Sequence, residues 1–218
     1  MGFKRISKNF LQEIWDFLGF PLRAFILDEE KQEKIGLTTL KEERIEHVLK
    51  LLKGRVLDLG CGENELIEKY RKNGGVGIGA DIVKYDKVDV VLNGSKLPFE
   101  KEFFDCVTII ASLNHIPRTE RLKVVKEVNR ILKPGGVFII TMLANSLGKV
   151  CHKLTYWDFD QNEREINFHE EDYSLSGRYI KELCEKADLK FFSKHSFLYG
   201  ANRIYIFEKQ AKKIGIVL

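Results

Sequence analysis

Short apolar runs alternate with helix-like stripes through the middle of the chain, and this alternation constrains its fold more than any other feature. Ile45, Val48 and Leu52 recur at helical spacing, and the apolar run 55–59 follows them. The last such run, 137–142, is apolar at successive positions, as expected for a strand buried on both faces. Strands separated by helices need crossover connections and form a parallel sheet, so the predicted fold class is α/β.

The boundaries of these elements follow from capping, glycine and proline signals. Thr39 with Glu42 three residues later forms a capping box that begins the first helix, and Gly54 ends it. Glycines at 74–75 end a second helix, and Pro134 with the glycines that follow ends a third. Strands are expected at 55–59, 76–82, 88–92, 106–111 and 137–142, then a helix over 179–187 and a strand pair at 191–198 and 203–208.

Composition excludes several other classes of protein. The 218 residues, 44% of them hydrophobic, suffice for one domain with a sizeable core. The longest apolar run is too short to span a membrane, and the N-terminus lacks the apolar core of a signal peptide. The formal net charge of +4 is too small to indicate nucleic-acid binding, and the four cysteines have no metal or disulfide spacing. We therefore expect a cytoplasmic protein with no metal and no nucleic-acid partner.

A glycine-containing turn follows the first expected strand. Asp58 lies near the end of that strand, and Gly60 and Gly62 let the backbone turn tightly and approach a ligand closely. In an open parallel sheet, ligands bind at the carboxyl ends of the strands. The dinucleotide pattern is incomplete because Glu65 occupies its last glycine position, and no P-loop motif occurs. Acids around the turn favour a ligand with a positive centre and no phosphate.

Four motifs, in order over residues 45–142, resemble those of class I S-adenosylmethionine (SAM)-dependent methyltransferases, in the group that includes the ubiquinone/menaquinone-biosynthesis methyltransferases. They are Asp58-Leu59-Gly60-Cys61-Gly62, Asp81 closing the run 77–81, Leu97-Pro98-Phe99 with Phe103-Phe104-Asp105, and Leu132-Lys133-Pro134-Gly135-Gly136. Each motif is weak alone, but their order and spacing are specific. The resemblance implies a Rossmann-like, seven-stranded, mostly parallel sheet with its last strand antiparallel, helices on both faces, and a single domain over 1–218.

The resemblance also implies SAM as the cofactor and assigns residues to it. Asp81 would accept hydrogen bonds from both ribose hydroxyls, as an acid there does in related nucleotide sites. Asn93 stands where related enzymes often carry an Asp that contacts the adenine amino group; an ordinary loop residue before Gly94 is the alternative. The complete set of implied cofactor contacts is Asp58, Gly60, Cys61, Gly62, Asp81, Ile82, Asn93, Gly94 and Ala111.

Three residues of the glycine turn allow more than one interpretation. Asp58 is expected to orient the turn, and a simple capping role is the alternative. Cys61 is expected to be a small spacer, because methyl transfer from SAM needs no enzyme nucleophile. Asn64 replaces the third glycine common in this family, a change we expect to be tolerated because Asn also adopts left-handed backbone geometry.

His115 is the candidate catalytic residue. It follows the fourth expected strand, where the cofactor and the acceptor meet in this family. A histidine with an ordinary pKa near 6.5 could take a proton from an attacking oxygen or nitrogen. The alternative is a packing or loop-anchoring role. His152 and His169 are weaker candidates for the same task.

Residues 1–37 and 145–173 fall outside the strand–helix alternation and are rich in aromatics. We expect 1–37 to form a helical and aromatic cap and 145–173 a lid-like insert, together roofing an apolar acceptor pocket above His115. Core packing and, less favoured, a basic helix on a membrane surface are alternatives for 1–37. The implied function is in-line methyl transfer to a small-molecule or lipid-like acceptor; a non-catalytic SAM-binding or scaffold protein is the alternative, and the oligomeric state is left open.

Overall fold

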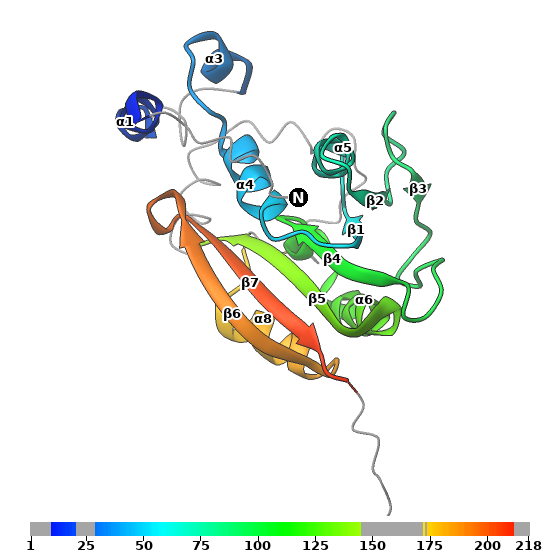
Figure 1. Ribbon diagram of the computed structural model, residues 1–218. Helices are drawn as coiled ribbons and strands as arrows, with labels where there is room; N and C mark the ends of the chain where they lie inside the picture. Colours follow the sequence, from blue (N-terminus) through cyan, green and yellow to red (C-terminus); the bar gives the residue numbers. More distant parts are fainter. Residues whose placement is uncertain (1–9, 21–28, 145–171, 173, 212–218) are drawn as a thin grey trace, which may run out of the picture.

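The computed structural model describes residues 10–20, 29–144, 172 and 174–211 (Figure 1). Its centre is a seven-stranded sheet in the order β3-β2-β1-β4-β5-β7-β6. Strand β7 is antiparallel to both neighbours, and the pairs from β3 to β5 are parallel, which confirms the predicted sheet. The strands are β1 (Arg55–Leu59), β2 (Val76–Asp81), β3 (Val90–Val91), β4 (Phe104–Ile110), β5 (Leu132–Leu143), β6 (Leu189–Phe197) and β7 (Asn202–Lys209).

Helices cover both faces of this sheet, as predicted. On one face lie α4 (Leu40–Leu49) and α5 (Glu65–Lys72), and on the other α6 (Arg118–Ile131) and α8 (Gly177–Glu185) (Figure 1). Each face has its own cluster of buried apolar side chains, so the sheet is buried on both sides. The short turns η1 (Leu113–His115) and η3 (Leu198–Gly200) follow β4 and β6.

Local sequence signals explain where the main helices begin and which face they bury. The backbone N–H of Glu42 donates to Thr39 Oγ1 at 3.0 Å, so the predicted start of α4 is confirmed. In α6, Val125, Val128 and Ile131 recur at helical spacing and are fully buried against the sheet. Burying each such side chain stabilises the fold by about 1.5–3 kcal/mol before the entropy cost of ordering is counted.

Several predicted strand boundaries are wrong, each for a local reason. Strand β5 begins at Leu132, because Leu132 pairs with Phe104 before an irregularity in register that precedes the pairing of Cys106 with Val137. Strand β4 ends at Ile110 rather than at Ala111, whose φ of +51° is left-handed and cannot continue a strand. Strand β3 spans two residues instead of the expected five.

The remaining boundary differences are shifts of one or two residues, which is the usual uncertainty at element ends. Strand β2 ends one residue earlier than expected, and α8 begins and ends two residues earlier. The terminal pair is β6 at Leu189–Phe197 and β7 at Asn202–Lys209, where 191–198 and 203–208 were expected.

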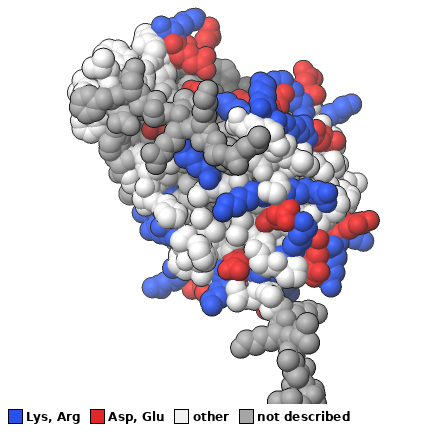
Figure 2. All heavy atoms as spheres, in the orientation of Figure 1, with Lys and Arg blue, Asp and Glu red and all other residues white. Residues whose placement is uncertain are grey.

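Helix α1 (Phe10–Leu18) buries Asp16 and leaves its described apolar side chains exposed. Asp16 is only 3% exposed and accepts a hydrogen bond from the Thr38 backbone N–H at 2.9 Å, whereas Leu11 is 73% exposed. Figure 2 shows uncharged atoms gathered where α1 lies. Helix α3 (Glu29–Lys34) also stands outside the layers around the sheet. Most of the predicted cap and insert lies outside the described residues, so their roofing role stays a prediction.

Candidate cofactor-binding site

The glycine turn after β1 is fastened to the end of the neighbouring strand β2. The backbone N–H of Gly60 donates to Ala80 O at 2.8 Å, and that of Gly62 donates to Asp81 Oδ2 at 2.9 Å. Gly60 has a φ of +71°, and a Cβ there would lie 2.5 Å from Ser112 Oγ. Glycine is therefore required at this position both for the backbone conformation and for the close approach of the segment after β4.

Asp81 fixes the shape of the site at the end of β2. Its second carboxylate oxygen, Oδ1, accepts the backbone N–H of Val83 at 3.0 Å, so the carboxylate bridges the glycine turn and the loop after β2. Its backbone carbonyl accepts the N–H of Leu92, which brings the end of β3 to the same place. The structure thus brings Asp81 together with Gly60 and Gly62, as the motifs predicted.

Asp58 is buried at the end of β1 and faces the neighbouring strand β4. It is 3% exposed, and its Oδ1 accepts a hydrogen bond from Thr108 Oγ1 at 2.6 Å. Burial raises the pKa of Asp58 to about 7; the Thr108 hydrogen bond opposes this shift, and the charge of Asp81 adds to it. Asp58 is therefore protonated in a substantial fraction of molecules near neutral pH.

Cys61 is half-buried between the two glycines of the turn. Burial, followed by the charges of Asp58 and Asp81, raises the pKa of its thiol well above the usual range. A thiol held protonated is a poor nucleophile, which agrees with the predicted spacer role.

Asn64 adopts the left-handed geometry that the sequence predicted, with a φ of 60°. Its side chain is fully buried, and its amide donates to Lys87 O at 2.7 Å and to Asp89 Oδ2 at 3.1 Å. A Cβ on Gly79 of β2 would overlap the Asn64 side chain, so this strand needs glycine there. Asn64 thus replaces a family glycine with a tether to the loop before β3.

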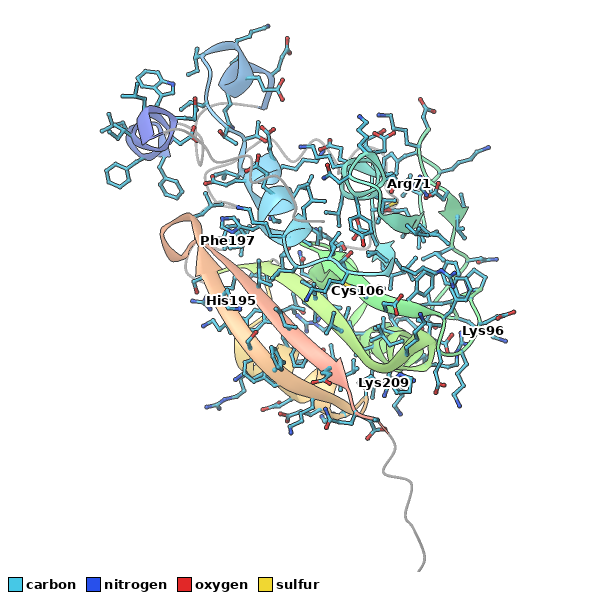
Figure 3. The ribbon with its side chains drawn as sticks, in the orientation of Figure 1. Arg71, Lys96, Cys106, His195, Phe197 and Lys209 are labelled. Carbon is cyan, nitrogen blue, oxygen red and sulfur yellow. The ribbon has the colours of Figure 1, made fainter. Side chains whose placement is uncertain are left out.

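Asp89 is the centre of that tether, and sequence analysis missed it. Its Oδ2 accepts the Gly79 backbone N–H and Arg71 Nη2, both at 2.7 Å, as well as the Asn64 amide. Burial raises the pKa of Asp89, but the hydrogen bonds from Arg71, Gly79 and Asn64 outweigh it and lower the pKa below its usual value. Figure 3 shows Arg71 on α5 beside β2. In the sequence, the one signal of this role was the position of Asp89 as an acid within the apolar run 88–92.

The predicted adenine-side residues lie at the carboxyl ends of β2 and β3. Ile82 directly follows Asp81, and its side chain is 67% exposed. Asn93 and Gly94 are exposed, and Gly94 has a φ of +84°. They follow Leu92, whose N–H is bonded to Asp81 O. An exposed isoleucine beside Asp81, the predicted ribose-binding acid, offers the kind of apolar surface on which a base can pack.

The segment after β4 closes the site on its other side. The Ala111 backbone N–H donates to Thr141 Oγ1 at 3.0 Å, and Ser112 Oγ donates to Leu59 O at 3.2 Å. His115 ends the short η1 turn and is half-buried, with its Nε2 at 3.2 Å from Asn114 Nδ2. The structure therefore places His115 at the carboxyl end of β4, as the sequence predicted.

A buried arginine holds the His115 loop in place, and sequence analysis missed it as well. Arg121 of α6 is 1% exposed; its guanidinium donates to Asn114 O, to Ile116 O and, at 2.6 Å, to Asp172 Oδ2. Arg118 also donates two hydrogen bonds to Asp172, from a side chain that is exposed to solvent. Burial raises the pKa of Asp172, but the bonds from the two arginines outweigh it and lower that pKa. The signal in the sequence was an arginine four residues before Val125 on the buried stripe.

Among residues 10–20, 29–144, 172 and 174–211, no three His, Cys, Asp or Glu side chains are grouped so that they could hold a metal ion. No helix in those ranges is both long enough and apolar enough to cross a membrane.

The sheet order, the glycine turn and the acid after β2 together define a class I SAM-dependent methyltransferase fold. A family model described as a methyltransferase domain matches residues 23–194. The chain belongs to this methyltransferase family, and the resemblance predicted from its motifs is confirmed.

Similar proteins agree with this assignment. A ubiquinone/menaquinone biosynthesis C-methyltransferase of Pectobacterium atrosepticum is 32% identical over 105 residues, which cover 39% of this chain and 41% of that protein. The chain thus spans about two fifths of that relative's length. An uncharacterised protein of Methanocaldococcus jannaschii is 36% identical over 93 residues, 40% of this chain and 36% of that protein.

A solved structure extends the likeness to nearly the whole fold. The Burkholderia thailandensis 1,6-didemethyltoxoflavin-N1-methyltransferase, solved with S-adenosylhomocysteine bound, superposes with a TM-score of 0.60 at 11% identity. The superposition covers 97% of this chain and 94% of that one. At this identity the likeness bears on the fold alone.

Proposed function

We propose that this protein binds SAM at the carboxyl ends of β1, β2 and β4 and transfers its methyl group to a small-molecule acceptor in the cytoplasm. The observation that carries the proposal is the bond from the Gly62 N–H to the Asp81 carboxylate. It joins the glycine turn to Asp81 at the end of β2. SAM is a nucleoside with an amino-acid tail, and a site for it needs both of these parts of the chain. SAM, when bound, supplies a methyl group already activated by a cationic sulfonium.

The residues at this edge of the sheet suit SAM in both charge and hydrogen bonding. Asp81 uses one backbone N–H on each carboxylate oxygen, and each oxygen can accept a further bond from a ribose hydroxyl. Ile82 and Asn93 supply an apolar face and an amide acceptor for adenine. The charge of Asp81 favours the positive charges of the cofactor rather than a phosphate.

The acceptor side of the proposal rests on His115 and on the class of acceptor. His115 follows Ala111, which is bonded to Thr141 of β5, and Ser112, which is bonded to Leu59 O just before the glycine turn, so a proton acceptor stands at the same edge of the sheet as the donor site. The Pectobacterium relative is named for quinone biosynthesis, which supports testing small, lipid-like phenols and quinols first. Holding donor and acceptor in line would supply most of the rate, and proton removal by His115 would add to it.

Isothermal titration of the intact chain with S-adenosylhomocysteine and SAM tests the donor site. We expect Asp81→Asn to weaken binding at least tenfold, since the amide keeps one acceptor and loses the charge-assisted bonds. Asp86→Ala is the matched control, because Asp86 is an exposed acid in the same loop, and it should change affinity less than twofold. No binding by folded protein, or equal losses in the two variants, would refute the donor site.

Metabolite profiling tests the transfer itself. Cell extract is incubated with the protein and methyl-labelled SAM, and labelled products are identified by mass spectrometry. His115→Ala should lower turnover about 10²-fold if His115 removes a proton, with S-adenosylhomocysteine affinity nearly unchanged. A rate per folded molecule within a few-fold of the original would assign His115 to loop packing instead. Binding without any labelled product would contradict the transfer.

A further inference from the structure

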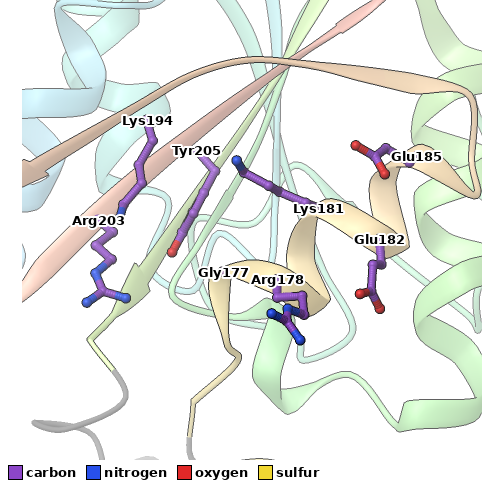
Figure 4. Close-up of a pocket in the computed structure, with 8 residues that line it drawn as sticks. All are labelled: Gly177, Arg178, Lys181, Glu182, Glu185, Lys194, Arg203 and Tyr205. Carbon is purple, nitrogen blue, oxygen red and sulfur yellow. The ribbon is translucent and has the colours of Figure 1, made fainter.

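A second concave site lies at the opposite end of the sheet from the glycine turn. It is a cavity of about 470 Å³ between α8 and the strands β6 and β7 (Figure 4). Two strands, β4 and β5, lie between β1 and β7 in the sheet, so this cavity is distinct from the donor site. Its lining residues are Gly177, Arg178, Lys181, Glu182, Glu185, Lys194, Arg203 and Tyr205.

Basic side chains at one end of this cavity lack counter-ions. Arg178, Lys194 and Arg203 make no ion pair or hydrogen bond with another side chain in the part of the chain that the structure describes. Lys181 differs, because its Nζ lies 3.6 Å from the centre of the Phe191 ring. Figure 4 shows Arg178 and Arg203 on either side of Gly177, with Glu182 and Glu185 farther along α8. One end of the cavity is therefore strongly positive.

The sheet register brings three of these polar groups together by construction. Lys194 pairs directly with Tyr205, and Arg203 precedes Tyr205 by two residues on the same strand, so all three side chains share one face. Tyr205 is 1% exposed, yet Figure 4 shows its hydroxyl pointing into the cavity between Arg203 and Gly177. No partner for that hydroxyl occurs among the described residues. The phenol is therefore a free donor and acceptor at the wall of the cavity, where a ligand can bond to it.

The first turn of α8 completes the set of donors. A Cβ on Gly177 would lie 2.7 Å from the Tyr205 hydroxyl, so glycine lets the helix start pack directly against that group. Ser176 Oγ caps the helix by accepting the Tyr179 N–H at 3.1 Å. The backbone N–H groups of Gly177 and Arg178, which precede Tyr179 in the same turn, have no acceptor among the described residues. Helix N-termini of this kind favour anions.

We propose that this cavity binds the phosphate group of a phosphorylated small molecule. Two guanidiniums, one ammonium, a phenol and the start of a helix line this part of the cavity, and a phosphate monoester has three oxygens and a near-double negative charge with which to engage donors among them. The phosphate belongs either to the methyl acceptor or to a separate ligand. Binding itself does not depend on the proposed methyl transfer.

Titration of the full chain with inorganic phosphate, followed calorimetrically at low ionic strength, tests the site. Arg203→Ala and Arg178→Ala should each weaken phosphate binding about tenfold or more, and Tyr205→Phe several-fold. The matched control is Lys190→Ala, an exposed lysine of β6 outside the cavity, which should stay within about twofold. Circular dichroism verifies that each variant is folded.

Two results would overturn the proposal. One is no detectable phosphate binding by the folded, unmodified chain up to about 10 mM, a range that includes weak sites. The other is an equal loss in Lys190→Ala and Arg203→Ala, which would mean attraction to the general surface charge. Because the titration contains no SAM, failure of the donor site leaves its outcome unaffected.

A second experiment separates the two sources of the phosphate. If the acceptor carries it, Arg203→Ala should remove phosphorylated compounds from the labelled products while S-adenosylhomocysteine affinity stays within about twofold. If a separate ligand carries it, the same products should form, and their rate should respond to added phosphate only in the unmodified chain. Either result supports the site; unchanged products with no response to phosphate count against it.

Discussion

The two ends of the sheet present opposite charges to a ligand. At β1 and β2 the carboxylate of Asp81 accepts backbone N–H groups of the glycine turn and of the loop after β2. Between α8 and β7 the side chains near Gly177 are basic, with Arg178 and Arg203 unpaired among the described residues, and Glu182 and Glu185 lie farther along α8. An acidic end suits a cationic donor, and a basic end suits an anionic ligand, so one sheet can keep two ligands apart by charge alone.

The two ends are also built differently. The donor end depends on short-range geometry, because Gly60 and Gly62 shape a turn that only a few residues define. The basic end depends on strand pairing, since Arg203 and Lys194 come from two strands and Arg178 from a helix. Local geometry leaves a motif in the sequence, whereas assembly by pairing leaves scattered residues.

The largest effect that we expect is on the free energy of unfolding, and it comes from replacing Arg121 of α6. Arg121→Ala removes a buried guanidinium that serves Asn114, Ile116 and Asp172, and it should lower the free energy of unfolding by about 3 kcal/mol. Urea denaturation measures this. Arg118→Ala is the control, since Arg118 binds the same Asp172 from an exposed position and should cost much less. Similar losses would mean that the burial of Arg121 is unimportant.

Substitutions in the glycine turn should weaken cofactor binding without changing phosphate binding at the basic end. Gly60→Ala meets both a positive φ and Ser112, and we expect S-adenosylhomocysteine affinity to fall about 30-fold, with phosphate binding unchanged. Gly62→Ala has a positive φ but open space, so its loss should be smaller. Adding Ser112→Gly to Gly60→Ala should recover part of the affinity; no recovery would contradict the steric explanation. Calorimetry measures all three variants.

The pH dependence of stability should reveal Asp58. Burial raises its pKa to about 7 from 3.8, so between these values the folded state holds a proton that the unfolded state has lost. Stability from this group is therefore full below about pH 4 and decreases as pH rises to 7. Asp58→Asn should be more stable than the unmodified chain at pH 8, by about 1–3 kcal/mol, and this advantage should shrink toward pH 4. An advantage independent of pH would contradict the raised pKa.

The smallest effect should be in the response to salt. Raising ionic strength from about 0.05 to 0.5 M should weaken phosphate binding at α8 several-fold, because the guanidiniums of the exposed Arg178 and the half-buried Arg203 are screened. Binding of S-adenosylhomocysteine should change less than about twofold, because its expected contacts are mostly hydrogen bonds at a half-buried turn. Parallel titrations measure both ligands, and equal salt responses would remove the contrast between the two ends.

Sequence alone predicted the sheet, the helices on both faces and the convergence of Asp81 with the glycine turn. These features depend on periodicity and on glycines close in sequence, which a single chain displays. The roles of Arg121, Asp89 and the Arg203 cavity were not predicted, because each depends on partners many residues away in the sequence. Strand ends also differed where a bulge or the left-handed backbone at Ala111 interrupted pairing.

The contact between Asn64 and Gly79 constrains how related chains can diverge. The Asn64 side chain fills the space that any side chain at position 79 would need. A side chain at position 79 can therefore be accepted only after Asn64 has been replaced by a smaller residue. If position 79 changed first, its new side chain and that of Asn64 would occupy the same space. The two positions form an ordered pair, and natural variants that carry a side chain at 79 should already have lost the asparagine.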